Sequence, residues 1–259
     1  MEKVTLTNHS FEKMDIQESK ELEIYVEKNA EASLYIATSA KVDLKCSITL
    51  EENAHLKALL WNECEGLNSE CVIMAKKDAK MELNLGEVNS GEVQSTQKIY
   101  LQGEGSELQL RSALAVSEKK HFEIECVHEA PYTQSNMENY AVVYEKGNFK
   151  MNDTGKILKD AYGSNSHQSS RALVLSEDQT CEITPILLID ENDVQASHAT
   201  TIGQIDENQL YYLQTRGLTK KQALGLITVG YLMPIASVLD DETLKEELTS
   251  KIEKKVGLS

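Results

Sequence analysis

The chain has 259 residues and a formal net charge of −16, from 42 acidic and 26 basic residues. A surface this acidic repels the phosphate backbone of nucleic acids and the headgroups of anionic membranes, so we expect neither as a partner. Five cysteines without a CxxC pair, and a charged rather than apolar beginning, predict reduced thiols in a cytoplasmic protein.

Residues 1–205 are predicted to form short β-strands. Val42, Leu44, Cys46, Ile48 and Leu50 alternate with polar residues, which is typical of a strand with one buried face. Similar alternation recurs further along the chain, in segments such as "MELNL" and "FEIEC". The pattern indicates a β-rich core.

The strands are preceded by similar corners. The segments "EKNAEASLYI", "EENAHLKALL" and "KKDAKMELNL" each place a charged pair, an Asn or Asp, and an Ala ahead of an apolar strand. Asn29, Asn53 and Asp78 are 24 and 25 residues apart, and "QGEGSELQL" follows after a similar interval. Asn, Asp and Gly tolerate the positive φ of a tight corner, and Ala lets successive corners stack. This repeat predicts a solenoid, in particular a parallel β-helix, with an antiparallel β-sandwich as the alternative.

Residues 206–259 are predicted to be helical. Asp206 can cap a first helix that ends at Gly217, and Thr219–Gln222 forms a capping box. The run Ala223–Leu239 is uncharged, but it is short for a membrane span and charged residues flank it. We interpret it as one long buried helix.

A third helix is predicted after Asp240 or Asp241, either of which can cap it, with Leu244, Leu248 and Ile252 along one face. The last coil of a solenoid exposes apolar side chains and unpaired backbone groups. We therefore expect the helices to cap that open end.

Several side chains could bind a metal. His198 shares a strand face with Val194, Ala196, Thr200 and Ile202, and we expect partial burial to keep its imidazole neutral. A core or interface histidine with satisfied hydrogen bonds is the alternative interpretation.

Cys126 and His128 also share a strand face, but Phe122 and Ile124 lie on it too, which favours core packing. The spacing of Cys64 and Cys71 fits no zinc site. The sequence also lacks the glycine-rich phosphate loop of nucleotide-binding proteins.

Residues 160–231 resemble the SufB/SufD family, the scaffold subunits of the SUF iron–sulfur cluster assembly machinery. Three segments carry the resemblance, in fixed order and spacing: "HQSSRALVLSE", "EITPILLIDENDVQASHATTIGQID" and "LYYLQTRGLTKKQA". The first 150 residues share the general character of the family but none of these motif segments.

The resemblance implies a right-handed parallel β-helix core over residues 1–205 and a C-terminal helical segment over residues 206–259. In the family, such helices dock a separate ABC-type ATPase, SufC, and the last β-strands pair two scaffold subunits. It therefore implies that Leu224, Ile227, Tyr231 and Leu232 contact the ATPase. It also places Val194, Ala196, His198 and Thr200 at the subunit interface.

The resemblance raises the expectation that His198 is a ligand of a nascent cluster or of iron, because it falls on a SufD-type interface histidine. Cys181 is a further candidate ligand. SufB-type members carry a core cysteine where this chain has Ser170, so the missing thiol could come from a SufB-type partner, or the chain could act as a homodimer.

We therefore predict a SufD-like, non-enzymatic scaffold that holds a transient iron–sulfur cluster and binds no nucleotide itself. Its expected partners are a SufC-like ATPase, a second scaffold subunit and a sulfur donor protein. The alternatives are a purely structural subunit without a metal role and a β-helix carbohydrate-active enzyme.

Overall fold

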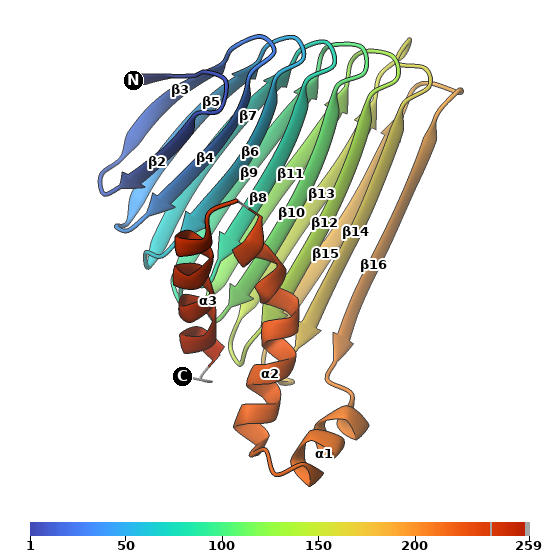
Figure 1. Cartoon of the computed structure of the whole chain (residues 1–259). Helices are drawn as coiled ribbons and strands as arrows, with labels where there is room; N and C mark the ends of the chain where they lie inside the picture. The colour runs from blue at the N-terminus through green and yellow to red at the C-terminus, as the bar shows by residue number, and fades with distance from the viewer. Residues whose placement is uncertain (239, 257–259) are drawn as a thin grey trace.

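The structure is a computed structural model that describes residues 1–238 and 240–256. Its β-strands form two eight-stranded sheets that face each other (Figure 1). One sheet contains, in spatial order, β1 (Glu2–Leu6), β3 (Lys20–Val26), β5 (Val42–Leu50), β7 (Gly66–Ala75), β9 (Glu92–Leu101), β11 (Lys119–His128), β13 (Asn148–Ile157) and β15 (Thr180–Ile189). The other contains β2 (Phe11–Ile16), β4 (Glu31–Thr38), β6 (His55–Asn62), β8 (Lys80–Glu87), β10 (Glu107–Val116), β12 (Gln134–Val143), β14 (Asn165–Val174) and β16 (Gln195–Gln204).

Successive strands alternate between the sheets, so each pair of strands makes one coil of a solenoid. Neighbouring strands within a sheet are parallel, for example β5 with β7 and β14 with β16. The predicted parallel solenoid is therefore confirmed. The antiparallel sandwich is wrong, because its neighbouring strands would run in opposite directions.

The predicted corner chemistry is confirmed. Asn29, Asn53 and Asp78 have φ values of 60°, 57° and 54°, and Gly105 continues the series at 72°. Asn53 Nδ2 donates a hydrogen bond of 3.2 Å to Asn29 Oδ1, so successive corners are linked through their side chains. The stacked corners hold the coils in register.

Apolar side chains fill the space between the sheets. The alternating residues of β5 predicted to face inward are at most 5% exposed. They belong to one continuous cluster that extends from Leu6 to Val174. Burial of these stacked columns is the main force that holds the solenoid together.

The helical segment has the predicted caps. Asp206 caps α1 (Glu207–Thr215), which is followed by Gly217 at a φ of 93°. Thr219 and Gln222 form the capping box of α2 (Lys220–Leu232). Asp241 Oδ1 accepts a hydrogen bond from the amide of Leu244, in the first turn of α3 (Glu242–Val256).

The predicted single helix over Ala223–Leu239 is wrong in its extent. α2 ends at Leu232, and a short 3-10 helix, η1 (Met233–Ser237), follows. Pro234 causes the change, because proline has no N–H to donate to the preceding turn. Leu239 lies outside the described residues. Among the described residues, we find no helix with the length and apolarity that crossing a bilayer requires.

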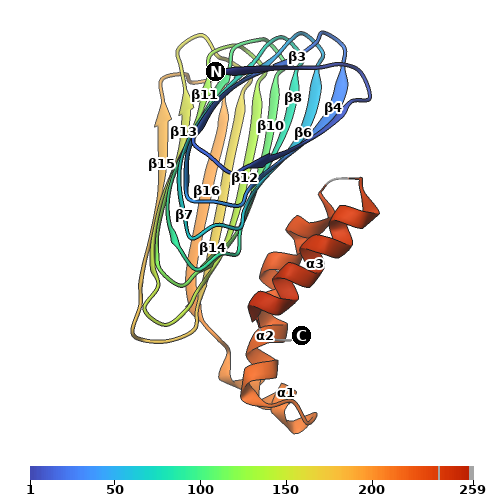
Figure 2. The ribbon, with the colours of Figure 1, turned by 90° about the vertical axis from the view of Figure 1, so that its left-hand side faces the viewer.

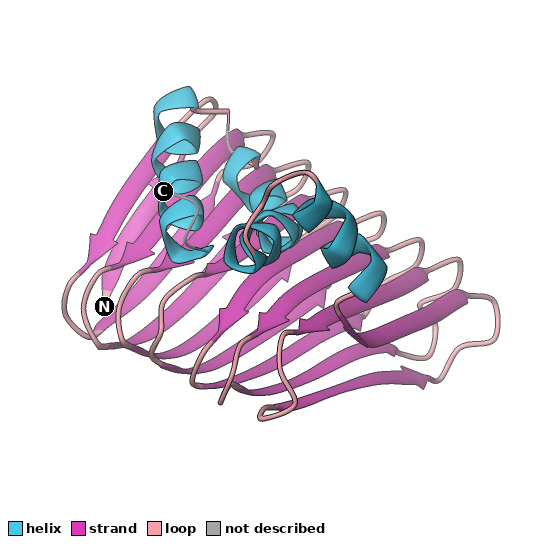
Figure 3. Ribbon diagram, turned by 90° about the horizontal axis from the view of Figure 1, so that it is seen from below, coloured by secondary structure: helices cyan, strands magenta, loops and turns pink. Residues whose placement is uncertain are grey.

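The helices do not cap the open end of the solenoid. From β16 they run back beside the outer face of the even-numbered sheet (Figures 1 and 2), where α2 and η1 contact β8, β10 and β12. The view from below shows them lying over this one side of the solenoid (Figure 3).

The reason for this placement lies in the outer face of the sheet. Tyr35, Leu59 and Trp61 point outward from their strands and pack with Leu248 and Ile252 of α3. Each of these five side chains is at most 1% exposed. The helices therefore bury an apolar patch on the side of the solenoid rather than its last coil.

Candidate functional site

The last coil of the solenoid is open. β15 and β16 are the edge strands of their sheets. Ile202 continues an inward-facing column above Ala172, and Ile189 continues another above Ile157. Yet Ile202 is 45% and Ile189 is 39% exposed, because no described segment covers this end. Exposed apolar side chains next to unpaired strand edges are typical of a surface that binds another protein.

His198 lies on this open coil. It pairs in register with Gln168, whose side chain faces the interior and is 1% exposed. His198 therefore points in the inward direction, but it is exposed because no further coil follows. The expectation of a partly buried ring is wrong for the chain by itself, so burial gives no argument for a neutral imidazole. Val194 and Ala196 are half-buried, and Thr200 is exposed.

Gln168 links the two sheets directly beneath His198. Its Nε2 donates hydrogen bonds of 3.1 Å to the backbone oxygens of Asp153 in β13 and of Ile186 in β15. Gly155 leaves room for this side chain, since a Cβ there would lie 3.2 Å from Gln168 Nε2 and 2.5 Å from Ser166 Oγ. The coil below His198 is thus held together by an amide that crosses the interior.

A buried carboxyl group lies in the same coil as Gln168. Asp153 is 0% exposed, and its Oδ2 accepts hydrogen bonds from Asn139 Nδ2 at 2.9 Å and Ser170 Oγ at 3.5 Å. Burial raises the pKa of Asp153 to about 7, against the opposing effect of these two donors. Ser170, the position for which the resemblance implies a cysteine in SufB-type members, thus carries a buried hydroxyl that is hydrogen-bonded to this acid.

Cys181 is not close to His198. It is the second residue of β15, whereas His198 is near the start of β16, and the two strands run in opposite directions (Figure 2). Burial raises the pKa of the Cys181 thiol to about 11. Within the described residues, no three His, Cys, Asp or Glu side chains are arranged to hold a metal ion.

The packing interpretation of Cys126 and His128 is confirmed. Both are 0% exposed inside the solenoid. The His128 ring nitrogens lie 2.8 Å from Thr133 Oγ1 and 2.9 Å from Ser135 Oγ, so neither is free for a metal. Burial lowers the pKa of His128 to about 4.

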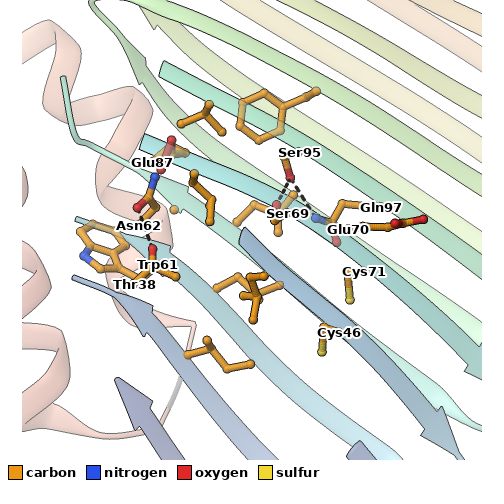
Figure 4. Close-up of a pocket in the computed structure, with 18 residues that line it drawn as sticks. Thr38, Cys46, Trp61, Asn62, Ser69, Glu70, Cys71, Glu87, Ser95 and Gln97 are labelled. Atoms are coloured by element: carbon orange, nitrogen blue, oxygen red, sulfur yellow. Dashed lines mark hydrogen bonds between the residues drawn. The ribbon is translucent and has the colours of Figure 1, made fainter. Parts of the chain in front are cut away.

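A small interior cavity contains a thiol pair that our reading of the sequence missed. Cys46 and Cys71 are partners in adjacent strands and line a cavity of about 40 Å³ (Figure 4). Contact with Cys46 and burial raise the pKa of Cys71 well above its usual value. Gln97 Oε1, which also lines the cavity, has no hydrogen-bond partner among the described residues, so a water molecule suits the space. The spacing of 25 residues between the two cysteines, equal to that of Asn53 and Asp78, was the available signal.

Sequence reasoning also missed a buried ion pair. Lys120 Nζ lies 3.2 Å from Glu87 Oε2, and the side chains are 0% and 4% exposed. Burial lowers the pKa of Lys120 and raises that of Glu87, while their mutual attraction opposes both shifts. Lys120 follows the strand alternation of β11, which was the only sign that it faces inward.

The predicted docking residues on α2 differ in exposure. Leu232 is 0% exposed and belongs to the cluster between the helices and the sheet. Leu224, Ile227 and Tyr231 are half-buried, and the Tyr231 ring packs edge-on against Tyr140 with centroids 6.4 Å apart.

The exposed apolar side chains of the helical segment are ones that were not predicted. Leu226 is 47% exposed, and Tyr211 and Tyr212 of α1 are 69% and 55% exposed. α1 has no buried residue and so offers its tyrosines to solvent or to a partner.

Comparison with known proteins identifies the family of the chain. The sequence profile of the family described as "SUF system FeS cluster assembly, SufBD core domain" matches residues 10–231. The iron–sulfur cluster assembly protein SufD of Bacillus subtilis is 35% identical over 182 residues, which cover 70% of this chain and 42% of that protein.

More distant relatives have related names. The SufD protein of Escherichia coli is 26% identical over 125 residues, which cover 48% of this chain and 30% of that protein. An iron–sulfur cluster assembly SufBD family protein of Mycobacterium tuberculosis is 29% identical over 170 residues, covering 65% of this chain and 20% of that protein. The chain thus spans less than half the length of these relatives. With its profile match over residues 10–231 and its parallel solenoid, the chain belongs to the SufBD core family of the SUF iron–sulfur cluster assembly system and is SufD-like.

Proposed function

We propose that the chain is a non-enzymatic scaffold subunit that pairs with a second scaffold subunit through its last coil and docks a SufC-like ABC ATPase through its helices. In this proposal, residues 1–205 form the core that carries the cluster site and residues 206–259 the ATPase-docking segment. The protein acts in the cytoplasm, and a sulfur donor protein delivers sulfide. Family membership favours this function over a carbohydrate-active enzyme.

The observation that carries the proposal is the position of His198. It projects from an uncovered coil that also exposes the apolar side chains of Ile189 and Ile202. A second subunit placed on this end would cover the apolar side chains and the strand edges. It would also bring its own side chains to the imidazole, which is a suitable ligand for iron.

The metal role is tested by anaerobic reconstitution. The chain is purified with its scaffold and ATPase partners, supplied with ferrous iron and sulfide, and examined by visible absorption. We expect His198→Ala to weaken the cluster absorption band. His167→Ala is the matched control, since His167 is an exposed histidine on the outer face of the neighbouring strand β14, with Nδ1 2.6 Å from Ser197 Oγ.

The outcomes separate the candidate roles. Equal bands for the His198 variant and the wild type would remove His198 from the site. No band with any scaffold partner would favour the purely structural subunit. Cys181→Ser tests the second candidate ligand, which is on the same coil but near its opposite corner.

Subunit pairing is tested on the open coil. We expect Ile202→Glu to abolish co-elution with the second scaffold subunit in size-exclusion chromatography with light scattering. Tyr25→Glu introduces the same charge at another exposed apolar position, 42% exposed on β3, and should leave pairing intact. Loss of pairing in both variants, or in neither, would argue against this interface.

ATPase docking is tested on the helices. Ile227→Asp should abolish co-purification with the ATPase, but Ile227 also packs against the chain's own sheet. Leu226→Asp is therefore the sharper variant, because Leu226 is 47% exposed and its replacement leaves the internal packing intact. A folded Leu226→Asp protein that still binds the ATPase at full strength would exclude this surface.

A further inference from the structure

One pocket of the molecule collects positive charge. It has a volume of about 630 Å³ and lies between the start of α2, the end of α3 and the corners that follow β12 and β14. Four lysines line it: Lys220, Lys221, Lys254 and Lys255. We call it the lysine pocket. In a chain with 42 acidic and 26 basic residues, four lysines around one pocket need a physical reason.

The lysines of this pocket are poorly neutralised. Glu145 is the single acidic residue among the described residues that line it. The ion pairs found elsewhere on the helices use other lysines, such as Lys245 with Glu242 and Lys251 with Glu247. The four charges therefore repel one another across a concave surface, where their fields add.

The helix dipole accounts for the position of only two of the four lysines. Lys254 and Lys255 occupy the last turn of α3, where positive charge favours the helix dipole. Lys220 and Lys221 occupy the first turn of α2, which contains no acidic residue. Positive charge at a helix N-terminus is unfavourable, because the free N–H groups there already carry partial positive charge. An anion bound in front of this turn would remove the conflict.

Other polar groups that line the lysine pocket could also donate hydrogen bonds to a bound ligand. Ser176 is half-buried, and its Oγ has no hydrogen-bond partner among the described residues, whereas the hydroxyl of the half-buried Tyr144 interacts with the side chain of Thr228. Among the described residues, the hydrogen-bond partners of Lys255 Nζ are neutral: Ser90 Oγ at 2.7 Å and Ser117 Oγ at 3.3 Å, with the Tyr144 ring at 6.0 Å. Burial, and the nearby Lys120, lower the pKa of Lys255 to about 8.

We propose that the lysine pocket binds a phosphorylated small molecule, with its phosphate held by the lysines and the start of α2 and its apolar part against Leu175 and Leu224. The volume is in the range of small-molecule sites, and lysine is a common phosphate ligand. A soluble ligand fits better than an anionic membrane, because the pocket is concave and a net charge of −16 opposes approach to such a surface. This inference does not depend on the scaffold role.

Calorimetric titration of the whole chain with phenyl phosphate and with tripolyphosphate tests the proposal. We expect saturable binding at one site, weakened at least tenfold in Lys220→Gln/Lys221→Gln and in Lys254→Gln/Lys255→Gln. Lys76→Gln/Lys77→Gln removes the same charge at a corner of the solenoid and should bind like the wild type. Phenol, which lacks the phosphate, should not bind.

Amine acetylation with mass spectrometry provides a readout at the site itself. Tripolyphosphate should slow the modification of Lys255 and leave that of Lys76 unchanged. Absence of saturable binding, or equal weakening in the Lys76/Lys77 variant, would overturn the proposal. Recruitment to phosphatidylserine vesicles without binding of phenyl phosphate would overturn it in favour of a membrane contact.

Discussion

Replacement of the buried acid Asp153 by asparagine should stabilise the protein at neutral and alkaline pH. The pKa of Asp153 is raised from 3.8 to about 7 by burial, so the folded state retains a proton that the unfolded state has released. Its stabilising contribution is fully present below pH 3.8 and is lost as the pH rises through about 7. A shift of about 3 pK units corresponds to roughly 4 kcal/mol in total, at about 1.36 kcal/mol per unit.

About one pK unit of this loss falls between pH 6 and pH 8, which is roughly 1.3 kcal/mol. Asp153→Asn removes the ionisable group while keeping a side chain of similar shape next to Asn139 and Ser170. We therefore expect the difference in unfolding free energy between variant and wild type to grow by about that amount, roughly 1.3 kcal/mol, over this pH range. Loss of hydrogen-bond geometry at the new amide lowers the absolute gain but not its dependence on pH.

Urea unfolding followed by circular dichroism at pH 6, 7 and 8 measures this difference. Asp190→Asn is the matched control, because it makes the same substitution at an exposed position, at the corner after β15. Its stability relative to the wild type should not change with pH. If Asp153→Asn loses stability between pH 6 and 8 as steeply as the wild type, the assignment of this titration to the buried carboxyl is refuted.

Three further predictions concern packing and the buried histidine. Gly86→Ala should destabilise the protein by about 1–3 kcal/mol, because a Cβ there would lie 2.2 Å from Trp61 Cε3. A red shift of the Trp61 fluorescence emission should accompany this loss of stability. An unchanged emission spectrum and an unchanged urea midpoint would contradict the steric overlap. Leu248→Ala should lower the free energy of unfolding by about 2–5 kcal/mol and loosen α3, because Leu248 is 1% exposed and packs against the sheet. Thr249→Ala is the control, since Thr249 is half-buried on the same helix, and its expected change is below about 0.5 kcal/mol. The pKa of His128 is lowered from 6.5 to about 4, so between these pH values the unfolded state binds more protons than the folded state. The stability of the protein should therefore fall as the pH drops from 6.5 toward 4. His128→Gln should flatten this fall, and an equally steep fall in the variant would show that other groups cause it.

The solenoid could be predicted from the sequence because its signals are local and repeated. Alternation along β5 identifies a strand with one buried face, and the recurring Asn29, Asn53 and Asp78 identify corners that need positive φ. Each coil repeats the same local requirements, so a pattern read in one coil applies to the next. Helix caps such as Asp206 and Thr219 are equally local, since a cap satisfies backbone groups within one turn.

The position of the helices could not be predicted in the same way. An apolar helix face is complementary to any apolar surface, so the sequence alone did not distinguish the end of the solenoid from its side. The decisive residues, Tyr35 on β4 and Leu59 and Trp61 on β6, form one patch only when these two strands stack side by side.

The candidate site likewise has features that the sequence predicts and features that only the tertiary structure determines. The order of residue types along β14 and β16 was enough to mark His198, and the family match agrees with the segment that carries it. Only the folded chain decides that His198 is exposed above Gln168, that Cys181 lies near the opposite corner, and that four lysines meet at one pocket. Local sequence determines strands, corners and caps because these depend on neighbouring residues, whereas exposure and charge clustering depend on which distant segments come together in space.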